Sequence, residues 1–202
     1  MRQNTFKLPN DLIDDTSLSY TARRLAATLF AHRNALGCCH KTYEQLAQLS
    51  HLSVATVRKA VRELSARGYI SFRTTRRCSE KLGRVVYGKT EYQCDLSFRH
   101  GYTMIPREIF RLDKSALSDS AFSVLLYILR SIRVKGNPAL RTYSSISKIS
   151  ERTGAAHSTV CLALRALKQL PMLVVQLCRK VNGAFAKTSF YLSHVLHAAG
   201  EQ

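Results

Sequence analysis

The sequence has few acidic side chains for its length and no long apolar run. Lys and Arg number 31 among 202 residues, whereas Asp and Glu number only 13, so the formal net charge is +18. No stretch reaches the roughly 18 apolar residues of a membrane-spanning helix, so we expect no membrane span. Residues 1–5 are polar and contain no apolar segment typical of a secretory signal, so we expect an intracellular protein.

Both halves of the chain share the excess of positive charge. Residues 1–97 carry a net charge of +8, and residues 98–202 carry +10. The apolar fraction of 46% is sufficient for packed cores, which argues against a fully disordered polycation. A folded basic protein favours nucleic acid as a partner, because neutralising phosphates releases counterions. Ribosomal and membrane-surface proteins are also basic, so charge alone does not decide the partner.

The motifs of common enzymes are missing. We find no Gly-rich phosphate loop with Lys and Ser or Thr, no His-Glu-x-x-His and no nucleophile elbow, so we expect no enzyme activity and no cofactor. The adjacent carboxylates Asp14 and Asp15 are expected near a helix start rather than in a nuclease site.

The six cysteines lack the spacing of a metal site. They include no Cys-x-x-Cys pair, and no His pair follows at zinc spacing. Cys38-Cys39-His40 resembles a cluster of ligands, but neighbouring side chains rarely chelate one tetrahedral ion together. We therefore expect free thiols and no bound metal.

An internal repeat of about 100 residues organises the chain. Residues 6–12 are matched by 103–109, residues 18–22 by 117–121, Thr42-Tyr43 by Thr142-Tyr143, and Thr56-Val57 by Thr159-Val160. The spacing of the matches drifts from 97 to 103, which indicates small insertions between them. We expect two modules, residues 1–97 and 98–202, with residues 95–102 as a short connection that keeps them close together.

Each module is predicted to be α+β and mainly helical. In the first module, Ser19 is a good N-cap for a helix that ends near Asn34 and Gly37. Thr42 begins a second helix, with Gln45 completing a capping box. After a short turn at residues 50–52, Ser53 caps a third helix. Its inner face carries Val57, Ala60, Val61 and Leu64.

A hairpin is predicted after the third helix, which ends at Arg67-Gly68. Residues 69–73 and 90–96 have the pattern of two strands, joined by a basic loop in which Gly83 and Gly88 give freedom. Two helices joined by a tight turn and followed by a hairpin are typical of a winged helix-turn-helix.

A family resemblance supports this interpretation. The first module resembles the helix-turn-helix domains of GntR-type regulators at Leu46-Ala47, Leu52-Ser53, Thr56-Val57, Ala60, Leu64 and Gly68-Tyr69-Ile70. The segments Leu8-Pro9 and Leu18-Ser19 with Ala22 resemble modules of phage and plasmid replication proteins. The resemblance covers most of residues 6–95, and residues 103–192 follow the same order more weakly. It implies two tandem winged helix-turn-helix modules with short β-hairpin wings.

In this fold the third helix enters the major groove of duplex DNA. Its outward face, with the cap before it, comprises Ser53, Ala55, Thr56, Arg58, Lys59 and Arg62. The three cations would bind guanine or phosphate, and Ala55 and the Thr56 methyl would contact a thymine methyl. Thr42 or Tyr43 would bind a phosphate. The wing would contact the backbone or minor groove through Arg73, Arg76, Arg77, Lys81, Arg84 and Lys89.

The second module departs from this pattern. Its third helix follows Ala156, which is a poor cap, and its outward face carries Ser158, Thr159, Cys161, Leu162 and Arg165. Cys161 and Leu162 replace two cations, so we expect weaker or different base contacts, or a surface that packs on protein. Asn182-Gly183 predicts a hairpin, and its phosphate contacts would come from Arg179, Lys180 and Lys187.

The sequence thus predicts a cytoplasmic, nucleoid- or plasmid-associated protein that binds double-stranded DNA and regulates transcription. The alternative is a replication initiator of a plasmid or mobile element that binds repeated origin sites. Either both modules contact adjacent groove segments, or one contacts bases and the other forms a homodimer. No third domain remains for a small-molecule ligand. An enzyme and a module that binds only protein are the other hypotheses.

Overall fold

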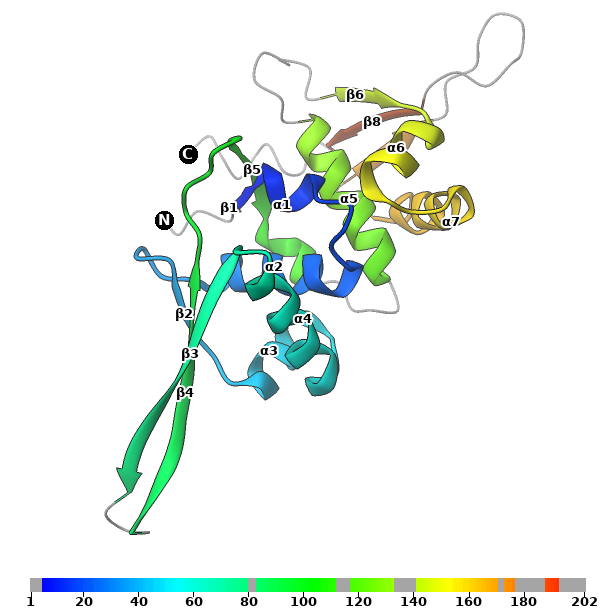
Figure 1. Ribbon diagram of the computed structural model, residues 1–202. Helices are drawn as coiled ribbons and strands as arrows, with labels where there is room; N and C mark the ends of the chain where they lie inside the picture. The colour runs from blue at the N-terminus through cyan, green and yellow to red at the C-terminus, as the bar shows by residue number, and fades with distance from the viewer. Residues whose placement is uncertain are drawn as a thin grey trace, which may run out of the picture.

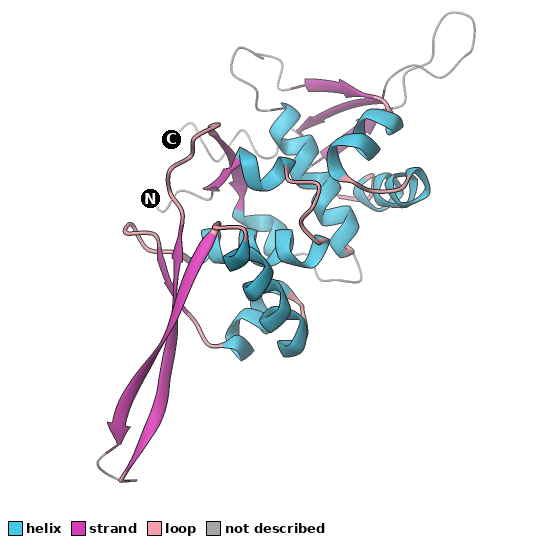
Figure 2. Ribbon diagram, viewed as in Figure 1, coloured by secondary structure: helices cyan, strands magenta, loops and turns pink. Residues whose placement is uncertain are grey.

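The computed structural model describes residues 5–79, 83–111, 117–132, 141–170, 173–176 and 188–192. These residues form an α+β fold with seven α-helices and three small antiparallel sheets (Figures 1 and 2). In chain order the elements are β1 (Thr5–Pro9), α1 (Asn10–Asp14), α2 (Tyr20–His32), β2 (Cys38–His40), α3 (Tyr43–Ser50), α4 (Val54–Ala66), β3 (Ile70–Ser79), β4 (Arg84–Cys94), β5 (Tyr102–Pro106), the 3₁₀ helix η1 (Arg107–Arg111), α5 (Asp119–Ile132), β6 (Arg141–Ser144), α6 (Ile146–Thr153), α7 (His157–Leu167), β7 (Leu173–Gln176) and β8 (Thr188–Leu192). None of the described helices is both long and apolar enough to cross a bilayer.

Helices α2 and α5 pack against each other at the centre of the molecule (Figure 1). All side chains from 22 to 31 of α2 and from 121 to 129 of α5 are buried. Helices buried on all sides are covered by neighbours rather than by solvent, and here α4 packs on α2 while α7 packs on α5. One apolar core therefore runs through both halves of the chain, from Phe6 to Phe190.

The order helix, strand, helix, helix, strand, strand occurs twice. In the N-terminal half the sheet order is β2-β4-β3, and in the C-terminal half it is β6-β8-β7. The helix pair α3–α4 corresponds to α6–α7, because each helix of the second pair begins 103 positions after its counterpart. The recurrence of the sequence repeat is thus visible in the order and pairing of the elements.

One of the sequence matches has the wrong register. Thr142-Tyr143 does not begin a helix as Thr42-Tyr43 does; both residues lie in β6 and pair with Phe190 and Ser189 of β8. The counterpart of Thr42 is Ser145, whose side chain accepts the amide hydrogen of Lys148 at the start of α6. The identical residue pair misled the alignment because the cap position only requires a hydroxyl, which Ser and Thr both supply.

The two lead-in segments of the repeat pair with each other as β1 and β5. Leu8 pairs with Thr103 and Phe6 with Ile105, in an antiparallel register centred on Lys7 and Met104. Because the repeat matches residue 6 with 103 and 8 with 105, each strand meets the copy of itself in reverse. This pairing has the symmetry of a twofold axis, although it lies within one chain.

The hairpin of the N-terminal half is longer than the short wing expected. Strands β3 and β4 contain 10 and 11 residues and pair up to Ser79 and Arg84. The basic residues expected in a loop lie largely in these strands, and Gly88 is inside β4 rather than in the turn, where Gly83 has a φ of 53°. The β-branched and aromatic residues Thr74, Thr75, Val85, Val86 and Tyr87 explain the extension, because such residues favour strands.

Two buried arginines of α2 connect the halves. Arg23 is 1% exposed and donates to the carbonyl oxygen of Thr153, at the end of α6, over 2.9 Å. Arg24 is 3% exposed; its Nε lies 2.7 Å from a carboxylate oxygen of Asp119, and its guanidinium lies 4.7 Å from the ring centre of Phe122. Burial lowers the pKa of Arg24, and the Asp119 carboxylate opposes that shift. The packing of α2 on α5 thus includes a buried ion pair.

The caps of α4 and α7 give a matched pair of stability predictions. The Ser53 hydroxyl accepts the amide hydrogen of Thr56 at 3.1 Å, whereas Ala156 forms no side-chain cap, as expected from the sequence. Ser53→Ala should therefore lower the free energy of unfolding by about 1 kcal/mol, and Ala156→Ser should raise it by a similar amount. Urea unfolding measures both changes. Equal responses in the same direction would contradict the assigned helix starts.

Candidate nucleic-acid interface

Helices α3 and α4 are joined by a tight turn whose geometry is set locally. Thr42 and Gln45 form the expected capping box at the start of α3. His51 ends α3 in the left-handed region with a φ of 55°, and the Leu52 amide then donates to the carbonyl oxygen of Ala47 at 3.0 Å. Leu52 is buried beneath this turn, which fixes the angle at which α4 leaves α3.

Helix α4 has the two faces expected from its sequence. Its inner residues Val57, Ala60, Val61 and Leu64 are at most 1% exposed. The side chains of Ser53, Ala55, Arg58, Lys59 and Arg62 are exposed, and Thr56 is half-buried. Among the described residues, no carboxylate forms a salt bridge with Lys59 or Arg62. The outer face therefore presents hydrogen-bond donors to solvent.

Tyr43 positions Arg58. The Arg58 guanidinium lies 5.4 Å from the centre of the Tyr43 ring, and that ring packs edge-on against buried Tyr92 with centroids 6.4 Å apart. An arginine over an aromatic face is held by the ring quadrupole. Tyr43, which was expected to bind phosphate, therefore also supports the neighbouring arginine. The sequence could not indicate this contact, because the two residues lie on different helices.

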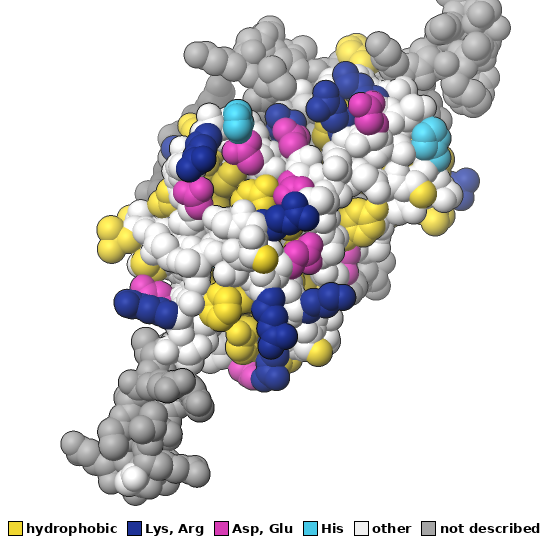
Figure 3. All heavy atoms as spheres, in the orientation of Figure 1, with side chains coloured by type: hydrophobic (Ala, Val, Ile, Leu, Met, Phe, Trp, Pro, Cys, Tyr) yellow, Lys and Arg dark blue, Asp and Glu magenta, His cyan; other side chains and the backbone are white. Residues whose placement is uncertain are grey.

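The hairpin β3–β4 projects from the body on the side of α3 and α4 (Figure 1). Arg73 is exposed at its base and donates to a carboxylate oxygen of Glu91 at 2.9 Å. Arg76 and Arg77 lie in β3, and Arg84 and Lys89 lie in β4; Lys81 lies outside the described residues. Figure 3 shows Lys and Arg side chains gathered over the α3–α4 end of the body, near the base of this hairpin.

Helix α7 presents a different surface. Ser158 and Arg165 are exposed, Thr159 and Cys161 are half-buried, and Leu162 is 63% exposed. The inner face is formed by Val160, Ala163 and Leu167, which are buried, and by partly buried Leu164, as the sequence predicted. Arg179, Lys180, Lys187 and the Asn182-Gly183 turn lie outside the described residues. The antiparallel pairing of β7 with β8 agrees with the expected hairpin strands.

Comparison with known families identifies the central motif. Residues 16–70 match a helix-turn-helix domain family. The match spans α2 to the start of β3, so α3, its turn and α4 form the helix-turn-helix, with α4 as its second helix. A comparison with curated proteins finds no match. A helix-turn-helix domain indicates DNA as the partner, since this motif places its second helix in the major groove.

The carboxylates Asp14 and Asp15 have structural partners. Asp14 ends α1 instead of lying at a helix start, and it accepts a hydrogen bond from Arg130 of α5. Burial raises the pKa of Asp14, although Arg130 opposes this shift. Asp15 accepts hydrogen bonds from Ser17 and Tyr69 and lies 3.6 Å from Arg67. The two side chains thus connect α1 to different neighbours.

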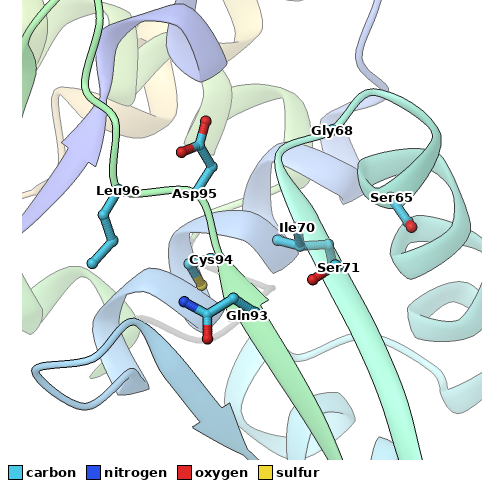
Figure 4. A pocket seen from close by; sticks show the side chains of 8 residues that line it. All are labelled: Ser65, Gly68, Ile70, Ser71, Gln93, Cys94, Asp95 and Leu96. Carbon is cyan, nitrogen blue, oxygen red and sulfur yellow. The ribbon is translucent and has the colours of Figure 1, made fainter.

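An open depression of ≈ 540 Å³ lies between the end of α4 and the base of the hairpin (Figure 4). Its ionisable lining groups are Asp95 and the thiol of Cys94. Asp95 accepts hydrogen bonds from the amide and hydroxyl of Ser97, and Cys94 is 1% exposed, with burial raising its pKa to about 12. The lining thus offers no convergent set of free charges for a ligand.

Proposed function

We propose that this protein is a sequence-specific double-stranded DNA-binding protein that regulates transcription. The observation that carries the proposal is the outer face of α4, where Arg58, Lys59 and Arg62 are exposed on the second helix of the helix-turn-helix. In the major groove, long donors reach the O6 and N7 atoms of guanine or the flanking phosphates. Ala55 and Thr56, at the start of the same helix, supply apolar contacts for thymine.

The hairpin β3–β4 is proposed as a wing along the DNA backbone. Ten residues of extended strand span about 33 Å, which is close to one turn of B-DNA, about 34–36 Å. A wing of this length beside α4 extends the contact well beyond the site occupied by the helix. The cations of its strands would neutralise phosphates without depending on the base sequence.

The double variant Arg76→Ala/Arg77→Ala tests the wing. It should weaken binding to all duplexes alike and reduce the slope of log K against log salt by about 2, since each lost phosphate contact reduces that slope by about 1. Fluorescence anisotropy at several salt concentrations measures this. The control Arg99→Ala/Lys168→Ala removes the same charge from exposed positions elsewhere. An unchanged slope in the wing variant would show that the hairpin does not lie on DNA.

The organisation into two modules, residues 1–97 and 98–202, supports a replication initiator as the second candidate function. A regulator should select a promoter site, often an inverted pair, whereas an initiator should select direct repeats from an origin. Selecting bound sequences from a random duplex pool, followed by footprinting, distinguishes the two. Equal protection of every sequence would contradict both. We propose that α7, where Leu162 is exposed in place of a cation, contacts DNA more weakly than α4.

A further inference from the structure

Three potential metal ligands meet on the solvent face of the sheet β2-β4-β3. Cys38 and His40 are alternate residues of β2 and share one face, because successive side chains of a strand point to opposite sides. His40 pairs with Glu91 of β4. The Cys38 sulfur, a His40 ring nitrogen and a Glu91 carboxylate oxygen all lie within 4.8 Å of one another. Cys39, between the first two, is buried on the opposite face.

We propose that Cys38, His40 and Glu91 bind a divalent transition-metal ion of the zinc class. Thiolate, imidazole and carboxylate are the three ligand types that zinc takes in proteins. Bond lengths of about 2.0–2.3 Å place the donors of a tetrahedral ion roughly 3.3–3.6 Å apart, so side-chain movements of about 1 Å close the site. The fourth position belongs to water or to the Gln93 amide oxygen, which lies 2.8 Å from the Cys38 sulfur.

The internal repeat shows that the fold does not require these three residues. The register of β6 with β8 places Arg141, Tyr143 and Ser189 at the positions of Cys38, His40 and Glu91. The equivalent sheet therefore forms without the thiol, the imidazole or the carboxylate. Their meeting in the N-terminal half alone is a property of that half and not of the sheet's architecture.

Arg73 competes with the proposed ion for Glu91. Its Nε donates to the carboxylate at 2.9 Å, but its side chain is 79% exposed, so it can turn into solvent when a metal ion binds. A depression of ≈ 300 Å³ bounded by Ser71, Phe72, Arg73, Glu91 and Gln93 adjoins the cluster. It leaves room for the ion with a bound water molecule.

Titration of the reduced full-length protein with Co²⁺ tests the proposal, because cobalt(II) replaces zinc and absorbs light when bound. We expect one equivalent to give the thiolate-to-cobalt charge-transfer band and the visible bands of a four-coordinate ion, and Zn²⁺ to displace it. Cys38→Ser should abolish the charge-transfer band, and His40→Ala should weaken binding by at least about tenfold. Arg73→Ala should tighten binding, since it removes a competing partner and a positive charge.

Cys161→Ser is the matched control, since it removes a half-buried thiol from α7 and should leave the spectrum unchanged. Circular dichroism verifies folding, and exposed His40 supplies an independent test if Cys38→Ser does not fold. A band that persists in Cys38→Ser, a loss caused by Cys161→Ser, or unchanged affinity in His40→Ala would each overturn the proposal. No DNA is needed, so the outcome is independent of the proposed function.

Discussion

Replacing Asp119 by Ala should lower the free energy of unfolding by about 3–5 kcal/mol, the largest stability effect we expect from a single change. The Asp119 carboxylate neutralises Arg24, whose side chain is 3% exposed between α2 and α5. Without it, the guanidinium stays buried with a carbonyl oxygen of Leu117 and the Phe122 ring as its neighbours. An uncompensated buried charge is strongly destabilising. Urea unfolding of both proteins measures the difference.

A second variant separates the charge effect from loss of the side chain. In Arg24→Met/Asp119→Ala no charge remains buried, and Met fills much of the volume of the arginine stem. We expect the double variant to recover most of the stability lost by Asp119→Ala, because replacing a buried ion pair by apolar groups is often neutral. If the double variant is as unstable as the single one, the ion pair is not the reason for the loss.

Arg62→Ala and Arg58→Ala should each weaken specific DNA binding by roughly 1–3 kcal/mol, or about 5- to 150-fold, if the side chain contacts a base. Both residues are exposed on the outer face of α4. Affinities for the selected site and for an unrelated duplex, measured at one salt concentration, give the result. The loss should be larger for the selected site, because base contacts carry specificity and phosphate contacts do not.

Arg165→Ala is the matched control, since Arg165 is exposed at the corresponding position of α7. We expect it to have a smaller effect than Arg62→Ala; equal losses would contradict the proposed difference between the halves. Tyr43→Phe and Tyr43→Ala divide the two roles of Tyr43. Phe keeps the ring beneath Arg58 and loses only the hydroxyl, so retained binding in Tyr43→Phe with a loss in Tyr43→Ala supports positioning of Arg58.

Local signals in the sequence were sufficient for the helix-turn-helix. The caps at Ser19, Thr42 and Ser53 and the inner face of α4 appear in the structure as expected. Each depends on residues within one or two turns of one another, so the physical cause lies within a short stretch of sequence. The longer hairpin was missed because pairing between β3 and β4, rather than glycine content, decides where the strands end.

Contacts between distant segments could not be inferred in this way. Glu91 is 51 positions from His40, and only the register of β2 with β4 brings their side chains together. For the same reason, the sequence placed Cys38 and His40 in a cluster but gave no third ligand. Asp119 likewise gave no sign that it would neutralise a buried arginine from the other half of the chain.

The sequence by itself determined the charge of the chain, its internal repeat and the position of the helix-turn-helix, because composition and short-range periodicity are properties of the chain before it folds. Only the tertiary structure decided how the halves meet. The β1–β5 pairing and the packing of α2 on α5 join residues about 100 positions apart. Such contacts depend on the complementary shape and charge of two folded surfaces, which neither segment specifies alone.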